Sequence, residues 1–167
     1  MDASVALGSG PEVALRQLAV ADIMTRSVLT FTPQTTIEQA ARLLNDRRIG
    51  GAPVLDGPRV VGVVSKSDLI DLIGDGSAPI ERVMTPVLRA VRPTDPALAA
   101  VRLMVNDRIH RALVMQDGRL VGIVTPLDVL RVVARGGAEA LAPRGASEWH
   151  ADPASAIYVD VRATWEP

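Results

Sequence analysis

The sequence predicts a mixed α/β (α+β) fold of two tandem β-α-β-β-α repeats that pack as a pseudo-two-fold pair. One observation is that residues 62–68 (GVVSKSD) return sixty positions later as residues 122–128 (GIVTPLD). Another is that other dipeptides recur at the same offset without a gap. They are Met24-Thr25 with Met84-Thr85, Arg42-Leu43 with Arg102-Leu103, and Arg48-Ile49 with Arg108-Ile109. Two copies of a sixty-residue period do not make a solenoid, and one copy is too small to cover its own sheet.

The repeats divide the chain into four predicted segments. These are residues 1–19 with a short helix from Pro11, repeat one at 20–75, repeat two at 76–135, and a linker and tail at 136–167. In the tail, Ile157, Val159 and Val161 alternate with polar residues, which predicts a strand. Three of the four aromatic residues of the chain also lie there. Because a lone strand is not stable, we expect the tail to pack on the rest of the molecule or on a dimer mate.

The first repeat opens with a predicted strand at 28–32. Thr35 and Glu38 form a capping-box pattern, so a helix should begin there. Its expected apolar face is Ile37, Ala40, Ala41 and Leu44, and Gly50-Gly51 end it. Two strands at 52–55 and 60–64 then flank a turn, and a second helix opens at Ser65 and Ser67 and ends at Gly74.

The second repeat has its own helix signals. Asp95 before Pro96 predicts an N-cap followed by proline at the first helical position. The expected apolar face of this helix is Ala97, Val101 and Met104. Asp117-Gly118 between apolar runs predicts a hairpin, and Thr125 before Pro126 predicts the last helix, which runs to about Ala134.

Composition excludes several classes of function. The net charge of −1 lacks the basic excess of a nucleic-acid-binding surface. There is no cysteine, and the two histidines lie in different segments, so a thiolate or histidine metal site is not expected. The N-terminus does not resemble a signal peptide, and no apolar run approaches the about 20 residues of a membrane span. We therefore expect a soluble, cytoplasmic protein that contacts neither nucleic acid nor membrane.

The repeated stretch Ser65-x-x-Asp68 and Thr125-x-x-Asp128 permits two interpretations. One is a helix cap, because Ser or Thr followed three residues later by an acid satisfies free amide donors. The other is a nucleotide site: a helix N-terminus with hydroxyls offers donors to phosphate, and an ionised carboxylate accepts from the two hydroxyls of a ribose. The residues alone leave both interpretations open.

Three motifs that occur jointly in both copies resemble a tandem pair of CBS domains, a Bateman module. They are Asp22-Ile23-Met24-Thr25 and residues 82–85, residues 48–54 and 108–114, and residues 59–68 and 119–128. The resemblance covers about residues 20–134 and not the tail. It implies a regulatory module that senses adenosyl compounds, namely AMP, ADP, ATP or S-adenosylmethionine, in the cleft between the repeats.

The resemblance also implies two sites, each formed by the acid end of one repeat and the first strand and middle of the other. Site 1 would comprise Ser65, Ser67, Asp68, Ala90, Ile109, His110, Arg111 and Ala112. Site 2 would comprise Thr25, Thr30, Gly50, Gly51, Ala52, Thr125 and Asp128. In site 1 the aspartate would hold the ribose, and His110 and Arg111 would face phosphates. Site 2 lacks these cations and has Leu127 where site 1 has Ser67.

A non-catalytic binding module is therefore the leading interpretation. The sequence shows no catalytic triad, no HExxH motif and no Walker-type lysine loop, so no catalytic residue, catalytic cofactor or metal is expected. The alternative is a dimerisation or protein-interaction module with degenerate sites. In either case we expect a homodimer, the commonest symmetric oligomer, and an effector protein whose identity the sequence does not give.

Overall fold

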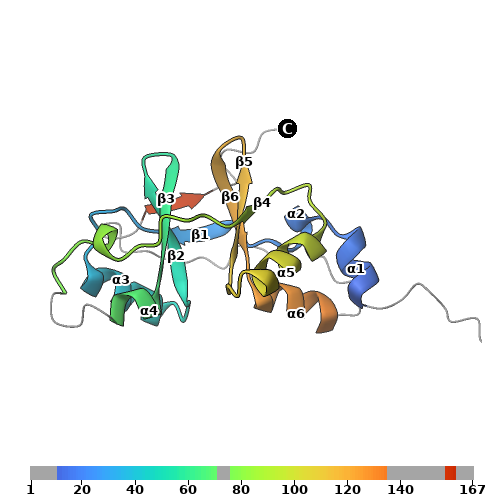
Figure 1. The fold of residues 1–167 in the computed structure, drawn as a ribbon, viewed down its shortest axis with the longest axis horizontal. Helices are drawn as coiled ribbons and strands as arrows, with labels where there is room; N and C mark the ends of the chain where they lie inside the picture. The colour runs from blue at the N-terminus through green and yellow to red at the C-terminus, as the bar shows by residue number, and fades with distance from the viewer. Residues whose placement is uncertain (1–10, 71–75, 135–156, 161–167) are drawn as a thin grey trace, which may run out of the picture. The chain divides into compact units, whose positions relative to one another are not determined.

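The computed structural model describes residues 11–70, 76–134 and 157–160, which form two compact units (Figure 1). We name them by the hydroxyl residue that each contains. The Ser65 unit holds the described residues of 26–88, together with 117–120 and 157–160. The Thr125 unit holds residues 11–25, 89–116 and 121–134. Each unit thus combines pieces of both sequence repeats.

The Ser65 unit is built on the antiparallel pair β2–β3. Its elements are β1 (Ser27–Thr30), α3 (Ile37–Asp46), β2 (Gly51–Asp56), β3 (Arg59–Ser65), α4 (Lys66–Ile70), the 3₁₀ helix η1 (Ile80–Arg82) and β7 (Ile157–Asp160). Phe31 continues β1 onto β2 through a parallel bridge to Val54. Phe31, Leu44, Val54, Val64 and Ile80 are almost fully buried in one apolar core.

The tail contributes a strand to the Ser65 unit. β7 pairs antiparallel with β1, with Ser27 opposite Asp160 and Thr30 opposite Ile157. This strand lies where the alternation in the tail predicts one. The linker and the remainder of the tail lie outside the described residues, as does the predicted end of the second helix at Gly74.

The Thr125 unit repeats this plan. Its elements are α1 (Pro11–Gln17), α2 (Val20–Ile23), β4 (Ala90–Val91), α5 (Ala97–Asn106), β5 (Ala112–Gln116), β6 (Arg119–Val124) from residue 121 onward, and α6 (Pro126–Ala134). The strands form one sheet in the order β4-β5-β6, with β4 parallel to β5. In the β5–β6 turn, Asp117 and Gly118 have φ values of 50° and 76°. Positive φ at both positions is the geometry that an Asp-Gly hairpin turn requires, so this turn is confirmed.

The same hydrogen bond occurs inside each unit, at positions sixty residues apart in the sequence. In the Ser65 unit, Ile37 N donates to Ala78 O at 2.9 Å. In the Thr125 unit, Ala97 N donates to Leu18 O at 2.7 Å. The chain segment before each Met-Thr pair therefore joins the helix N-terminus of the other repeat, which explains why the units mix pieces of both repeats.

The caps predicted at Thr35 and Asp95 are wrong in the same way. Thr35 Oγ1 accepts a hydrogen bond from Thr32 N at 3.1 Å, and Asp95 Oδ2 accepts one from Arg92 N at 2.7 Å. These side chains close the turn before each helix. The capping box of α3 instead joins Thr36 and Gln39, and α5 begins after Pro96 without a side-chain cap.

The predicted apolar face of α3 is wrong at one position. Ala41 is exposed, and Leu43 is buried beside Leu44. The helix also ends before Gly50, because Arg48 adopts a left-handed conformation with φ of 54°. Arg108 has the matching φ of 53° at the end of α5, so both repeats turn on an arginine there.

Candidate functional site

In the Ser65 unit, Ser65, Ser67 and Asp68 lie where β3 passes into α4, and we call this junction the hydroxyl end of the unit. The carboxylate of Asp68 holds it together. Asp68 Oδ2 accepts from Ser65 N and from Ser65 Oγ, both at 2.7 Å. Ser65 Oγ and Ser67 Oγ are also 2.7 Å apart. Because the single hydroxyl proton of Ser65 goes to the carboxylate, Ser67 acts as the donor in that contact.

The Thr125 end makes the same two bonds and two more. Asp128 Oδ2 accepts from Thr125 N at 2.8 Å and from Thr125 Oγ1 at 2.6 Å. Its other oxygen, Oδ1, accepts from Arg131 Nη1 at 3.0 Å and from Thr25 Oγ1 at 3.3 Å. Asp128 is only 5% exposed, so its carboxylate is buried with both oxygens engaged.

The two carboxylates therefore differ in whether they can accept a further hydrogen bond. Asp68 is half-buried, and in the described part of the chain its Oδ1 accepts no hydrogen bond. A carboxylate oxygen has two lone pairs, so Asp68 can still accept from a ligand hydroxyl. Both ends are half of a capping box: the acid reaches back to the N–H before the helix, and the hydroxyl donates to the acid. The cap interpretation and a remaining acceptor coexist at Asp68.

A Met-Thr pair holds each hydroxyl end in place. Its backbone pairs with the strand that leads into that end, β3 with Gly62 or β6 with Gly122. Val63 and Thr85 exchange two backbone hydrogen bonds of 2.9 and 2.8 Å, and Ile123 and Thr25 exchange two of 2.9 Å. A Cβ on Gly62 would lie 3.0 Å from Thr85 O, and one on Gly122 would lie 3.1 Å from Thr25 O. A Cβ at either position would push against the Met-Thr backbone, so glycine suits this close approach and the two motifs recur together.

The members of predicted site 1 fall on both units. Ser65, Ser67 and Asp68 belong to the Ser65 unit. The others belong to the Thr125 unit: Ala90 is exposed on β4, Ile109 and Arg111 are half-buried, His110 is exposed, and Ala112 is buried in β5. Arg111 has an interaction partner within the described chain. The assembly of this set into one site remains a prediction.

The members of predicted site 2 are also divided. Thr25, Thr125 and Asp128 come together within the Thr125 unit through the bonds described above. Thr30, Gly50, Gly51 and Ala52 belong to the Ser65 unit, where Thr30 and Ala52 are buried. There Gly51 pairs with Ser65, and Gly50 O accepts from Lys66 N at 3.0 Å. Gly50 and Gly51 thus lie beside the hydroxyl end of their own unit.

Arg131 is a residue at the candidate site that the sequence does not single out; it pairs with Asp128. It lies three positions after Asp128 on α6, which places the two side chains on one helix face. The only signal was this spacing, and such pairs are frequent on helix surfaces.

The structure also contains no described helix of the length and apolarity needed to cross a membrane.

Comparison with known proteins gives two tandem matches to one family model. The model of the CBS domain matches residues 20–75 and again residues 80–135. An uncharacterized protein of Methanocaldococcus jannaschii, MJ1232, is 26% identical over 122 residues, covering 72% of this chain and 41% of that protein. The inosine-5′-monophosphate dehydrogenase of Korarchaeum cryptofilum is 32% identical over 105 residues, covering 62% of this chain and 22% of the enzyme. This chain spans less than half the length of these curated relatives.

Two solved structures cover most of the described residues. CBSX2 in complex with AMP is 30% identical with a TM-score of 0.65, over 70% of this chain and 96% of that chain. The CBS domain pair of MJ0100, in complex with 5′-methylthioadenosine and S-adenosyl-L-methionine, is 26% identical with a TM-score of 0.64, over 71% and 97%. These matches confirm the fold class and the resemblance from which the candidate site residues are taken.

Proposed function

This chain belongs to the CBS domain family, and we propose on that premise that it is a regulatory module that binds an adenosyl compound without transforming it. The candidate ligands are AMP, ADP, ATP and S-adenosylmethionine. The proposal is supported by two structural neighbours, one a complex with AMP and the other with 5′-methylthioadenosine and S-adenosyl-L-methionine. Regulation would follow from the ligand's differential stabilisation of one arrangement of the module.

The observation that carries the proposal is the remaining acceptor on Asp68. A ribose presents two adjacent hydroxyl donors, and Asp68 has one carboxylate oxygen without a hydrogen bond in the described chain. Both carboxylate oxygens of Asp128 already accept hydrogen bonds from groups of the protein itself. We therefore assign ribose binding to Asp68 and a structural role to Asp128, which makes one ligand per chain the expected stoichiometry.

The remaining members of site 1 have roles that follow from their chemistry. Ser65 and Ser67 hydroxyls can reorient toward a phosphate, and His110 and Arg111 add donors, of which the guanidinium gives the stronger, charge-assisted bond. Ala90, Ile109 and Ala112 would border the base. For site 2, Thr30, Gly50, Gly51 and Ala52 would line a cleft whose carboxylate is already occupied, so we expect it to be the weaker site or an empty one.

Thermal unfolding with and without ligand tests this function. We would melt the wild-type chain and Asp68→Asn with AMP, ADP, ATP, S-adenosylmethionine, NADH and GTP. A ligand at one hundred times its dissociation constant adds about 2.7 kcal/mol, which is about 5–10 °C for a chain of this size. The matched control is Asp56→Asn, which changes an exposed carboxylate at the end of β2.

The expected result is a shift with an adenosyl ligand that disappears in Asp68→Asn and remains in Asp56→Asn. A shift that survives Asp68→Asn would show that the ligand is held elsewhere and would refute the ribose assignment. The absence of a shift with every ligand would refute the sensor function itself.

A second candidate, an association module, is favoured by one surface. On α6, Leu127, Leu130 and Val133 recur every three residues and are 56%, 59% and 43% exposed. An apolar helix stripe of this kind is typical of a face that a second subunit covers. Leu130→Asp should convert a homodimer to a monomer in sedimentation if this face is the interface. An unchanged mass would remove the support for this candidate.

A further inference from the structure

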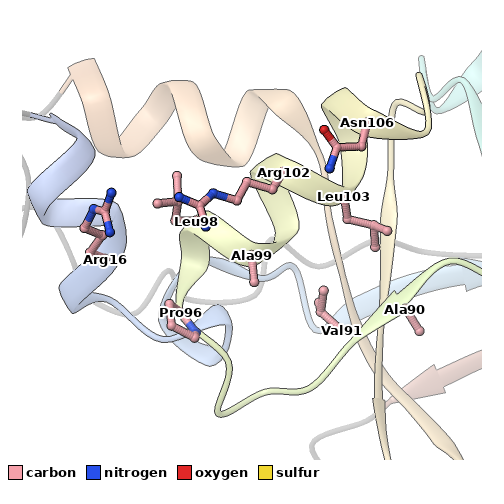
Figure 2. Close-up of a pocket in the computed structure, with 9 residues that line it drawn as sticks. All are labelled: Arg16, Ala90, Val91, Pro96, Leu98, Ala99, Arg102, Leu103 and Asn106. Carbon is pink, nitrogen blue, oxygen red and sulfur yellow. The ribbon is translucent and has the colours of Figure 1, made fainter.

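A pocket of about 610 Å³ lies within the Thr125 unit, where α1, α5 and β4 meet (Figure 2). Its volume falls in the range of small-molecule sites, about 300–1,000 Å³. Of the predicted adenosyl-site residues, only Ala90 lines it. The remaining lining residues are Arg16, Val91, Pro96, Leu98, Ala99, Arg102, Leu103 and Asn106.

The lining is apolar except for two arginines and one amide. Val91 is buried, and Leu98, Ala99 and Leu103 are half-buried on the face of α5 that borders the pocket. In Figure 2, Arg102 extends from α5 toward the side on which Arg16 stands, while Asn106 lies near the end of α5. The cationic groups therefore gather at one end of an apolar surface.

The charges around this pocket do not balance. Arg16 Nη2 donates to Glu12 Oε1 at 2.7 Å, so these two charges compensate each other. This hydrogen bond and the charge of Arg16 lower the pKa of Glu12, and the charge of Arg102 adds to the effect. Arg102 itself makes no hydrogen bond in the described part of the chain. Counted over the lining residues and the hydrogen-bonded partner of Arg16, two guanidinium groups and one carboxylate leave a single positive charge in excess.

We propose that this pocket binds a small carboxylate carried on an apolar chain. The carboxylate would pair with Arg102, and the chain would lie against Leu98, Ala99 and Leu103. A single excess cation matches a single anion, and Arg binds a carboxylate in a bidentate geometry. The apolar lining stabilises a hydrocarbon chain in proportion to the area it buries and offers nothing to a polyphosphate. This inference does not depend on the adenosyl site.

Octanoate is the probe that tests the proposal, with the full chain labelled with ¹⁵N and followed by NMR. We expect saturable shifts at residues 98–106 and at α1. Arg102→Ala should weaken binding about tenfold, because a hydrogen-bonded charge pair is lost at an exposed site. The matched control is Arg42→Ala, since Arg42 is the exposed repeat counterpart of Arg102 on α3 and does not line the pocket. It should leave octanoate binding unchanged.

Two further probes separate the contributions of charge and chain. Octanol has the same chain without the charge, and inorganic phosphate has the charge without the chain, so both should bind at least about tenfold more weakly. Octanol that binds as tightly as octanoate, phosphate that displaces octanoate from the same residues, or octanoate binding unaffected by Arg102→Ala would each overturn the proposal. So would the absence of any octanoate shift.

Discussion

Asp68 and Asp128 occupy the same position of a duplicated motif, but they have different surroundings. Each accepts two hydrogen bonds from the Ser or Thr three residues earlier. Asp128 adds Arg131 and Thr25 and is buried, whereas Asp68 keeps an oxygen without a bond in the described chain. The two copies of the motif therefore differ: Asp128 is bonded to the protein through both oxygens, whereas Asp68 is the carboxylate that we propose as the ligand acceptor.

The difference arises in two side chains outside the motif. Arg131 has Asp71 as its counterpart sixty residues earlier, so the charge at that position is inverted between the repeats. Thr25 has the counterpart Thr85, but only Thr25 reaches its aspartate in the described structure. The four-residue motif therefore forms its own internal hydrogen bonds. Side chains outside the motif determine whether its carboxylate can accept further ones.

The largest effect should come from filling the glycine positions that support the two ends. Gly62→Val and Gly122→Val should each destabilise the chain by about 3 kcal/mol, because the new side chain meets a Met-Thr backbone that cannot move freely. The measurement is chemical denaturation with wild type as reference.

A suppressor distinguishes the two glycines. At Gly122 the tightest contact of an added Cβ, 2.6 Å, is with the flexible Met24 Sδ, so Met24→Ala should restore part of the stability of Gly122→Ala. At Gly62 the backbone oxygen of Thr85 is as close as Met84 Sδ, so Met84→Ala should restore less. Equal rescue at both positions would contradict this difference in packing.

Asparagine at the two acidic positions tests the comparison directly. Asp128→Asn should cost about 2 kcal/mol of folding stability, because a buried acceptor of four hydrogen bonds loses its charge and part of its geometry. Asp68→Asn should cost about 1 kcal/mol, the worth of a helix cap, and should abolish adenosyl binding. Both are measured by urea unfolding and ligand titration. A larger stability loss at Asp68 would reverse the assignment.

Much of this structure could be predicted from the sequence, because the relevant information is local or repeated. The sixty-residue offset predicts the duplication, and the Asp-Gly turn predicts the hairpin. The capping box of α3 could not be placed, since Thr35 and Thr36 are each followed three residues later by a suitable partner, Glu38 or Gln39. Thr36 forms the capping box, because the hydroxyl of Thr35 accepts a hydrogen bond from Thr32 N in the preceding turn.

The sequence names the candidate residues of both sites and ranks site 1 above site 2, but the assembly of either set into one site stays a prediction. The sequence shows that site 2 lacks His110, Arg111 and a second serine, which favours site 1. It does not show that Arg131 and Thr25 occupy Asp128, because one contact is a common helix spacing and the other spans 103 positions of the chain. Contacts of that separation become visible only in the folded structure.

Arg131→Ala is a smaller change that sharpens the same comparison. Arg131 is 40% exposed, so the loss of its ion pair should cost about 0.5 kcal/mol. The variant frees Asp128 Oδ1 from its charged partner, and a second, weaker adenosyl binding event should then appear in calorimetry. Arg131→Lys, which retains the charge, is the control and should keep the single event. A wild-type chain that already binds two equal ligands would show that Arg131 does not close the second end.

The smallest effect should come from the ion pair between Glu12 and Arg16 on α1. Arg16 lowers the pKa of Glu12 below its ordinary value of 4.5, first through their hydrogen bond and then through its charge. The stability that this pair contributes is therefore present above the unfolded pKa and is lost as the pH falls through the lower folded value. Glu12 is exposed, so Glu12→Gln should leave the melting temperature at neutral pH almost unchanged and should slightly flatten its decline in acid. A variant that removed most of the decline in acid would contradict this small contribution of the α1 ion pair.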